Sequence, residues 1–361
     1  MKKLKSLLLM LILVVFIGGC SCSSNDGCEC PNDNQSTEEQ YMNVVTDYSE
    51  LFKGVAQSVV KITVQKGSYS ATGSGVVFFQ EGDKAYILTN AHVVKDVNST
   101  YDVNVIFSDE DGFESGLVEK VETSNIYKNT DEDVAVLEIS KSSKYKVAKI
   151  GDSDKLDKGE FVFTVGSPFG KFNYTSAGNV MSKNVPVVLK GSEVTSYVIV
   201  SDAVINQGNS GGALFNKEGE LVGITSFRYD KDAITNSPIY QMYGSLAINH
   251  AHKVAKSLIT KGEYVRPTLN LELESINEMG IKKDSYGISR TITSGVYVVN
   301  GLENAIAPQS VITAVNDVEV RSVNEFYVQL LKYDVGQTIR LTIKTKDDSI
   351  TREGIQVTLH A

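Results

Sequence analysis

Between about residues 50 and 247 the chain consists of short apolar runs, each ended by Gly, Asn or Asp. Short apolar runs at this spacing, separated by turn residues, predict a β-barrel or a β-sandwich. The predicted strands cover 59–64, 75–79, 85–89, 103–107, 134–139, 161–165, 197–200, 212–215, 221–226 and 243–248. We therefore expect a mainly β fold in which two barrels are joined near residues 150–160.

The pattern becomes helical after the last of these strands. Apolar residues then recur at helical spacing and form one stripe: Ala251, Val254, Ala255, Leu258 and Ile259. We expect Asn249 to cap the start of this helix and Gly262 to follow its end. The domain that begins near residue 46 is therefore predicted to close at 262.

A second, small α+β domain is predicted for residues 266–361, which open with Arg266 and Pro267. Its predicted strands cover 295–299, 311–315 and 339–343. Ser322 and Glu325 have the spacing of a capping box, so a helix is expected to follow Ser322. This mixture of elements is typical of a small α+β domain.

The charge of the chain limits its function. Its net charge of −9 argues against a nucleic-acid partner, because phosphate binding needs a basic face. Hydrophobic residues make up 42% of the 361 residues, which is enough for a sizeable core. We expect no cofactor and no metal in the folded domains.

The first 20 residues have the pattern of a secretion signal. Lysines at positions 2, 3 and 5 precede an apolar run over 7–17, which is shorter than the roughly 20 residues of a membrane-spanning helix. The run leads into Ile-Gly-Gly-Cys20, which resembles a bacterial lipobox. We expect a lipoprotein signal peptide over 1–20 and lipidation of Cys20, which would anchor the protein outside the cell membrane. The alternative is an ordinary cleaved signal in which Cys20 has no role.

All four cysteines lie near the N-terminus, at 20, 22, 28 and 30, so the predicted domains depend on no disulfide. If Cys20 is lipidated, Cys22, Cys28 and Cys30 are an odd set and cannot all pair within the chain. No nearby His completes a metal site with them. Residues 21–45 are polar and predict a disordered tether.

Three polar residues at the borders of apolar strands predict a nucleophilic site. Ser210 lies in Asn-Gln-Gly-Asn-Ser-Gly-Gly at 206–212, His92 follows the strand at 85–89, and Asp133 opens the strand at 134–139. A serine hydroxyl needs a base, and the base needs an orienting partner. The order His, Asp, Ser is that of the chymotrypsin-type triad. We therefore predict Ser210 as nucleophile, His92 as general base and acid, and Asp133 as the carboxylate that orients the imidazole.

The glycines around Ser210 predict an oxyanion hole at Gly208, Asn209 and Ser210, in which the Gly208 and Ser210 N–H groups point to one spot. Gly211 and Gly212 are expected to let substrate backbone approach closely. Bland alternatives exist for each part. The serine could lie in a hairpin turn, the histidine could be structural, and Asp133 could be a solvated turn residue.

These motifs together resemble the bacterial HtrA (Deg) serine proteases, and the resemblance covers about residues 50–361. It is carried by GSGVV at 73–77, LTNAHVV at 88–94, DVAVL at 133–137, VGSPFG at 165–170, SAGNV at 176–180, SDAVINQGNSGG at 201–212 and LVGI at 221–224. The resemblance implies a chymotrypsin-like double six-stranded β-barrel and the same three catalytic residues. It also implies a homotrimer that acts on unfolded or misfolded exported proteins.

The segment 266–361 resembles a PDZ domain through 295–299, 311–317 and 322–326. A PDZ domain adds a peptide strand to a sheet edge and holds its carboxylate in a nest of N–H groups. That nest is expected at 268–271, where Asn270 stands in place of the usual Gly. A purely structural domain is the alternative.

The specificity pocket is predicted just before the serine, at Val204 and Ile205, and on the following strand, at Ile224, Thr225 and Ser226. With no acid at its base, it predicts cleavage after small or medium apolar residues. The overall prediction is a membrane-tethered, ATP-independent serine endopeptidase for protein quality control. The alternative is a chaperone or peptide-binding scaffold with an idle triad.

Overall fold

In the computed structural model, the described residues are 47–189, 192, 194–231, 235–301 and 306–361. The predicted signal peptide over 1–20, Cys20 and the tether over 21–45 lie outside the described residues. Residues from Val45 onward belong to one compact unit. Within the described part of the chain, no helix is both long and apolar enough to cross a membrane.

The first half of the β-rich region before residue 262 is a seven-stranded antiparallel sheet that follows a short helix, α1 (Ser49–Ala56). Its strands are β1 (Val59–Lys66), β2 (Tyr69–Glu81), β3 (Lys84–Thr89), β4 (Asp102–Ser108), β5 (Glu114–Val121), β6 (Ile126–Asn129) and β7 (Val134–Ser140). They pair in the order β5-β4-β1-β2-β3-β7-β6. The expectation of six strands is therefore wrong for this half, whose hydrogen bonds form an open path of seven strands.

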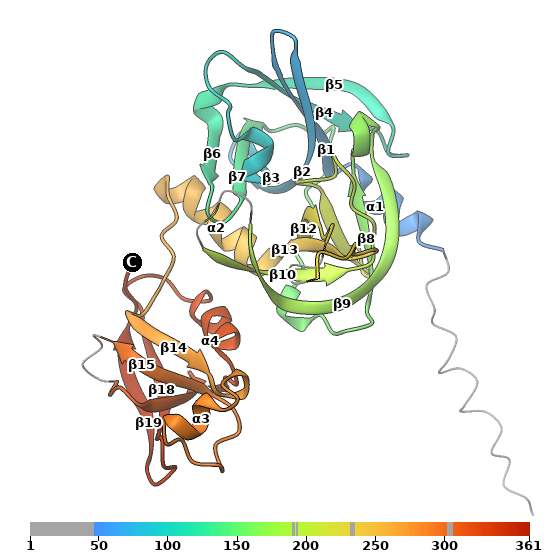
Figure 1. Cartoon of the computed structure of the whole chain (residues 1–361). Coiled ribbons are helices and arrows are strands. Elements are labelled where there is room, and N and C mark those ends of the chain that lie inside the picture. The colour runs from blue at the N-terminus through green and yellow to red at the C-terminus, as the bar shows by residue number, and fades with distance from the viewer. Residues whose placement is uncertain (1–46, 190–191, 193, 232–234, 302–305) are drawn as a thin grey trace, which may run out of the picture. The chain divides into compact units, whose positions relative to one another are not determined.

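The second half is a closed six-stranded barrel, as expected (Figure 1). Its strands are β8 (Phe161–Gly166), β9 (Tyr174–Val188), β10 (Thr195–Ser201), β11 (Ala213–Asn216), β12 (Leu221–Arg228) and β13 (Tyr243–Ala247). They close in the order β10-β13-β12-β11-β8-β9. Figure 1 shows β9 as a long, strongly curved strand. Most of its side chains are exposed or half-buried, which explains why no apolar run announced it.

Strand β7 is buried on both faces, and this position accounts for its unbroken apolar sequence. Val134 and Val136 belong to the core shared with the barrel, whereas Ala135 and Leu137 point into the core of the first sheet. Alternate residues of a strand face opposite sides, so one strand serves both cores. A one-residue shift of β7 would exchange the two sets, and the start of this strand is therefore held firmly in place.

Helix α2 (Ile248–Lys261) packs its predicted stripe into the shared core, where Ala251, Val254, Ala255 and Leu258 are buried. Gly262 ends the helix with φ of 80°, the left-handed conformation that glycine adopts most easily. The expected cap at Asn249 is wrong. The helix begins at Ile248, so Asn249 lies inside its first turn. The Asn249 side chain instead donates to Asp152 at 2.7 Å.

The C-terminal domain has the predicted mixture of strands and helices around its own apolar core. The strands are β14 (Leu271–Ser275), β15 (Val296–Gly301), β16 (Ser310–Val315), β17 (Val318–Glu319), β18 (Thr338–Thr345) and β19 (Thr351–Thr358), and the helices are α3 (Lys282–Ser285) and α4 (Val323–Leu330). Ser322 caps α4 by accepting from the Glu325 N–H at 3.2 Å, as the capping box predicts. The main path of the sheet runs β14-β15-β16-β18-β19, so β14 is an edge strand.

Candidate active site

The pairing of β3 with β7 brings His92 and Asp133 together. Thr89, at the end of β3, lies opposite Ala135, near the start of β7. His92 follows on a short 3₁₀ helix over Ala91–Val94, and Asp133 immediately precedes β7. His92 Nδ1 lies 2.9 Å from Asp133 Oδ2 and 3.0 Å from Oδ1, and the His92 N–H also donates to Oδ1. Because Nδ1 is engaged by the carboxylate, Nε2 is the ring nitrogen left to exchange a proton with a substrate or nucleophile.

Asp133 is held in a strained conformation. Its φ is 52°, a left-handed value that is uncommon for a residue with a side chain. Its carbonyl accepts hydrogen bonds from the Ala91 N–H and the Asn90 side chain, both at 3.1 Å. The Ser226 hydroxyl donates to Asp133 Oδ2 at 3.1 Å. Such strain costs on the order of 1–3 kcal/mol and persists only where surrounding contacts determine it, as they do here.

Ser210 lies beside the same strand that carries Ser226. Its hydroxyl donates to the Ser226 carbonyl at 3.0 Å. The backbone on both sides is tied to β12, because the Gly211 N–H donates to the Thr225 carbonyl and the Thr225 N–H donates to the Gly212 carbonyl. The Thr225 hydroxyl donates to the Asn209 carbonyl at 2.6 Å. β12 thus holds Ser210 and, through Ser226, the Asp133 carboxylate.

Ser74 joins the two halves behind the nucleophile. Its fully buried hydroxyl donates to the Gly208 carbonyl at 2.7 Å and accepts from the Ser167 N–H at 2.8 Å. Its N–H donates to the Ser210 carbonyl at 2.9 Å. The sequence pattern did not predict that Ser74, Thr225 and the hydroxyl of Ser226 hold the site. The sequence did contain a signal for Ser74, because it lies between two glycines. Glycines often occur where two backbone segments approach closely.

The structure separates the three predicted oxyanion-hole positions. The Asn209 N–H is engaged by the Asn206 carbonyl at 2.9 Å. Within the described residues, neither the Gly208 nor the Ser210 N–H has a protein acceptor. Gly208 has φ of 101°, and a Cβ there would lie 2.5 Å from the Ser167 carbonyl oxygen, so this position requires glycine.

Gly211 and Gly212 lie where the protein's own chain segments pack closely. A Cβ on Gly211 would lie 2.1 Å from Thr89 Oγ1, and one on Gly212 would lie 2.6 Å from the Val165 carbonyl oxygen. These glycines therefore admit close approach of the protein's own strands. The expectation that they make room for substrate backbone is not what the structure shows.

A cleft of about 600 Å³ lies beside His92 and Asp133. Its other lining residues are Lys95, Val187, Val188, Leu189, Ser226, Phe227 and Tyr229. The wall is mostly apolar, and burial raises the pKa of Tyr229, which keeps that phenol neutral.

Of the predicted pocket residues, only Ser226 lines this cleft. Ile224 is fully buried in the shared core, Thr225 is used by the nucleophile loop, and Ile205 is buried. The Val204 carbonyl accepts from the Thr164 hydroxyl at 3.3 Å, and this contact ties Val204 to the barrel. The end of β9 and the residues after Ser226 were missed, because their apolar side chains carry no chemical signature in the sequence.

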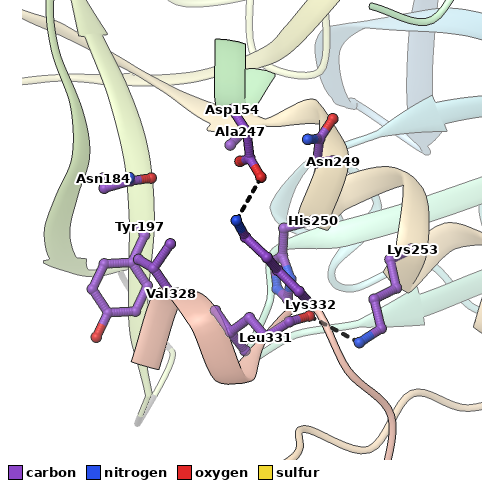
Figure 2. Close-up of a pocket in the computed structure, with 10 residues that line it drawn as sticks. All are labelled: Asp154, Asn184, Tyr197, Ala247, Asn249, His250, Lys253, Val328, Leu331 and Lys332. Carbon is purple, nitrogen blue, oxygen red and sulfur yellow. Dashed lines mark hydrogen bonds and ion pairs between the residues drawn. The ribbon is translucent and has the colours of Figure 1, made fainter. Parts of the chain in front are cut away.

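A separate cavity of about 360 Å³ is lined by residues of the barrel, α2 and α4 (Figure 2). His92 and Ser210 are not among the described residues that line it. No cluster of three or more His, Cys, Asp or Glu side chains suited to a metal ion occurs in the described part of the chain.

The fold, the site and the similarity to known proteins together define the class of protein to which this chain belongs. Residues 73–224 match the family model of the trypsin-like peptidase domain, a span that contains His92, Asp133 and Ser210. The chain has a trypsin-like, mainly β fold and is a serine endopeptidase. It belongs to the HtrA family of serine proteases. It is 30% identical to the "Serine protease Do-like HtrA" of Lactococcus lactis subsp. cremoris over 325 residues, which are 86% of this chain and 76% of the relative. The protein of the same name from Lactococcus lactis subsp. lactis is also 30% identical, over 83% of this chain and 80% of its own length.

Solved structures agree on the fold. The structure "HtrA-type protease AlgW with tripeptide" matches with a TM-score of 0.64 and 22% identity, over 87% of this chain and 98% of that chain. A serine endoprotease from Yersinia pestis matches with a TM-score of 0.55 over 88% of this chain. Both matches extend well beyond the trypsin-like segment, so they cover the fold of most of this chain.

Proposed function

We propose that this protein is a membrane-tethered, ATP-independent endopeptidase that degrades unfolded exported proteins through a triad of His92, Asp133 and Ser210. The observation that carries the proposal is the chain of hydrogen bonds from Ser226 to Asp133 to His92. This chain orients the imidazole with Nδ1 toward the carboxylate. An oriented imidazole is what a serine nucleophile needs from its base.

In the proposed reaction, His92 Nε2 takes the proton of Ser210 as Oγ attacks the peptide carbonyl, and later gives a proton to the leaving amine. Asp133 stabilises the imidazolium that forms between these steps. The Gly208 and Ser210 N–H groups are the donors we assign to the oxyanion, and each typically contributes about 10²–10³ in rate. We do not include Asn209 among the donors, because its N–H already binds the Asn206 carbonyl.

The hydrogen bond that the Ser210 hydroxyl donates has to break before this hydroxyl can react. Its proton is held by the Ser226 carbonyl. A rotation about the Cα–Cβ bond frees it, and His92 can then accept the proton. We propose that this arrangement is a resting state, which substrate binding converts into the reactive one.

The cleft supports a preference for apolar side chains in the substrate. Val187, Val188, Leu189 and Phe227 give it an apolar wall. One methylene in such a pocket changes discrimination by only about 1–3 kcal/mol, so the preference is loose. A loose preference suits an enzyme whose substrates are unfolded chains, which expose many apolar residues.

Residues 266–361 are proposed to form a PDZ-like domain that presents β14 to a peptide. The support is that β14 is an edge strand with α4 beside it, and that a shallow cavity at 268–272 borders Tyr327. We further propose, from the sequence, a lipid anchor at Cys20 on the extracytoplasmic face of the membrane, and a homotrimeric assembly.

The test is proteolysis of an unfolded protein, such as reduced casein, by the full chain in detergent, with the product termini sequenced. We expect cleavage after apolar residues, without ATP, and labelling of Ser210 by a fluorophosphonate. Ser210→Ala should fold but neither cleave nor label. Undiminished cleavage by that variant would contradict the triad. Binding of unfolded protein without cleavage or labelling would favour the scaffold alternative.

A further inference from the structure

The residue directly before Asp133 is a buried carboxylate that the proposed mechanism does not use. Glu132 is 2% exposed. Arg266 Nε donates to Glu132 Oε1, and Arg266 Nη2 donates to Oε2, both at 2.7 Å. His250 Nε2 lies 2.8 Å from Oε2. Both oxygens of this carboxylate are therefore engaged by side chains that do not line the catalytic cleft.

The charge on Glu132 persists in spite of its burial. Burial raises the pKa of Glu132, but hydrogen bonds from His250 and Arg266 outweigh it and lower the pKa to about 2. All three nitrogens of the Arg266 guanidinium are engaged, because Nη1 donates to the Thr195 carbonyl at 2.7 Å. Buried ion pairs seldom improve stability over an apolar replacement, so a role in geometry is the better reason for keeping one.

Glu132 and Asp133 are consecutive, and their side chains are anchored in different places. Glu132 is bound by Arg266, while Asp133 is bound by His92 and Ser226. The peptide between them belongs to the strained turn in which Asp133 has φ of 52°. A fork of two parallel hydrogen bonds fixes a carboxylate in orientation as well as position. Holding Glu132 in this way limits how far the backbone of Asp133 can rotate.

Arg266 comes from outside the trypsin-like fold. It follows α2 and opens the C-terminal domain. A second contact ties the same connection to the turn, since the Asn129 side chain donates to the Tyr264 carbonyl at 3.3 Å. Helix α2, which carries His250, also carries Lys253, whose ammonium donates to the Leu331 carbonyl at 2.8 Å near the end of α4 (Figure 2). The connection to the C-terminal domain is therefore bonded to the turn that presents the triad carboxylate.

We propose that Arg266 is a positioning residue for the triad, which acts through Glu132 to hold Asp133 in the orientation that His92 needs. The inference rests on the proposed function, because it assigns Asp133 the role of orienting carboxylate. It adds that the connection to the C-terminal domain controls the alignment of the catalytic carboxylate.

The test compares Arg266→Met, Arg266→Lys, Glu132→Gln and the double variant Arg266→Met/Glu132→Gln in the full chain, on a short chromogenic peptide. We expect kcat to fall on the order of 10–100-fold in Arg266→Met with KM little changed, because small misplacements of a catalytic group have effects of this size. Arg266→Lys keeps the charge but cannot form the fork, so it should fold and show an intermediate loss. Arg340→Met, which removes an exposed arginine paired with Asp317, is the matched control and should keep the wild-type kcat.

Two readouts separate positioning from loss of fold. The double variant leaves no unpaired buried charge, so its Tm should recover relative to Arg266→Met while its kcat stays low. KM should stay near its wild-type value in every variant, because none of them changes a residue that lines the cleft.

Recovery of kcat together with Tm in the double variant would overturn the inference, as would a wild-type kcat in folded Arg266→Met. Fluorophosphonate titration gives the concentration of competent sites in each sample, so kcat refers to active enzyme only. Ser210→Ala is assayed alongside. Cleavage by that variant contradicts the proposed function, whereas an inactive Ser210→Ala with an unaltered Arg266→Met contradicts only this inference.

Discussion

The protease region and the C-terminal domain use buried polar groups in opposite ways. In the protease region, buried hydroxyls such as those of Ser74 and Thr225 bond to the backbone around Ser210, and the carboxylate of Glu132 is buried and charged. Among the described residues of the C-terminal domain, the buried polar side chains are those of Ser275 and Ser310. The ion pairs between its own residues are exposed, as that of Arg340 with Asp317 is, or partly exposed, as that of Lys344 with Asp348 is.

This difference follows from what each part has to do. Chemistry needs several groups held within a fraction of an ångström, and buried, fully bonded polar networks provide that rigidity because each broken bond is costly. A domain that presents a sheet edge to a peptide, as proposed for residues 266–361, needs an apolar core and a soluble surface. The comparison predicts that polar substitutions of similar size have large effects in the first region and small effects in the second.

The largest effect is expected for Asp133→Asn. The amide cannot stabilise the imidazolium and favours the wrong tautomer of His92, so kcat should fall by about 10³–10⁴ while the fold is kept. Peptide hydrolysis at several pH values measures this, with Tm as the control for folding. A loss of less than tenfold would contradict the assignment of Asp133.

Glu132→Gln should change how stability depends on acid. The folded pKa of Glu132 is about 2 against an ordinary 4.5, so its contribution to stability is present above about pH 4.5 and is lost as pH falls toward 2. A pKa shift of this size corresponds to about 3 kcal/mol in the free energy of unfolding at neutral pH. Denaturant unfolding between pH 2 and 7 should therefore give a flatter profile for the variant.

Asp347→Asn is the matching variant in the C-terminal domain. The pKa of Asp347 is also lowered to about 2, by hydrogen bonds from Thr345 and Ser349. That carboxyl lies fully exposed in a turn of the C-terminal domain, where solvent screens it. The variant should change the acid profile far less than Glu132→Gln. Equal changes in the two variants would break the comparison between the regions.

Ser74→Ala should be the next in size. It leaves the Gly208 carbonyl and the Ser167 N–H without their buried partner, which costs about 1–3 kcal/mol in the free energy of unfolding. Because Gly208 carries one of the proposed oxyanion donors, kcat should fall as well. Thermal unfolding and peptide hydrolysis check the two effects. An unchanged kcat would show that Ser74 supports only stability.

Ser310→Ala is expected to have the smallest effect. The Ser310 hydroxyl donates to the Ala307 carbonyl at 2.6 Å, a single local bond worth about 1 kcal/mol or less. Thermal unfolding should show a small shift and hydrolysis should show none. A loss of activity here would show that buried polar groups inside the C-terminal domain also support the chemistry, against the contrast between the two regions.

Much of the fold followed from the order of residues alone. Apolar runs marked β1, β3, β7 and β12, because buried strands need apolar side chains whatever their neighbours are. The strand β9 carried no such run, since its side chains are largely exposed and its place is set by pairing with β8 and β10. Two strands of the first sheet were also missed: β5, whose side chains are mostly exposed, and β6, which is only four residues long.

The serine, histidine and aspartate of the candidate site could be predicted from the sequence, because only a few residue types can carry out that chemistry. The glycines indicated where the backbone had to turn. The supports of the site could not be predicted in this way. Nothing in the local sequence shows what the supporting residues Ser74, Ser226 and Arg266 hold. Folding brings Ser74 to the backbone of Ser210 across 136 positions, and it brings Arg266 to the carboxylate of Glu132 across 134 positions. Distances of that kind depend on how whole sheets pack, and local sequence has no means of recording them.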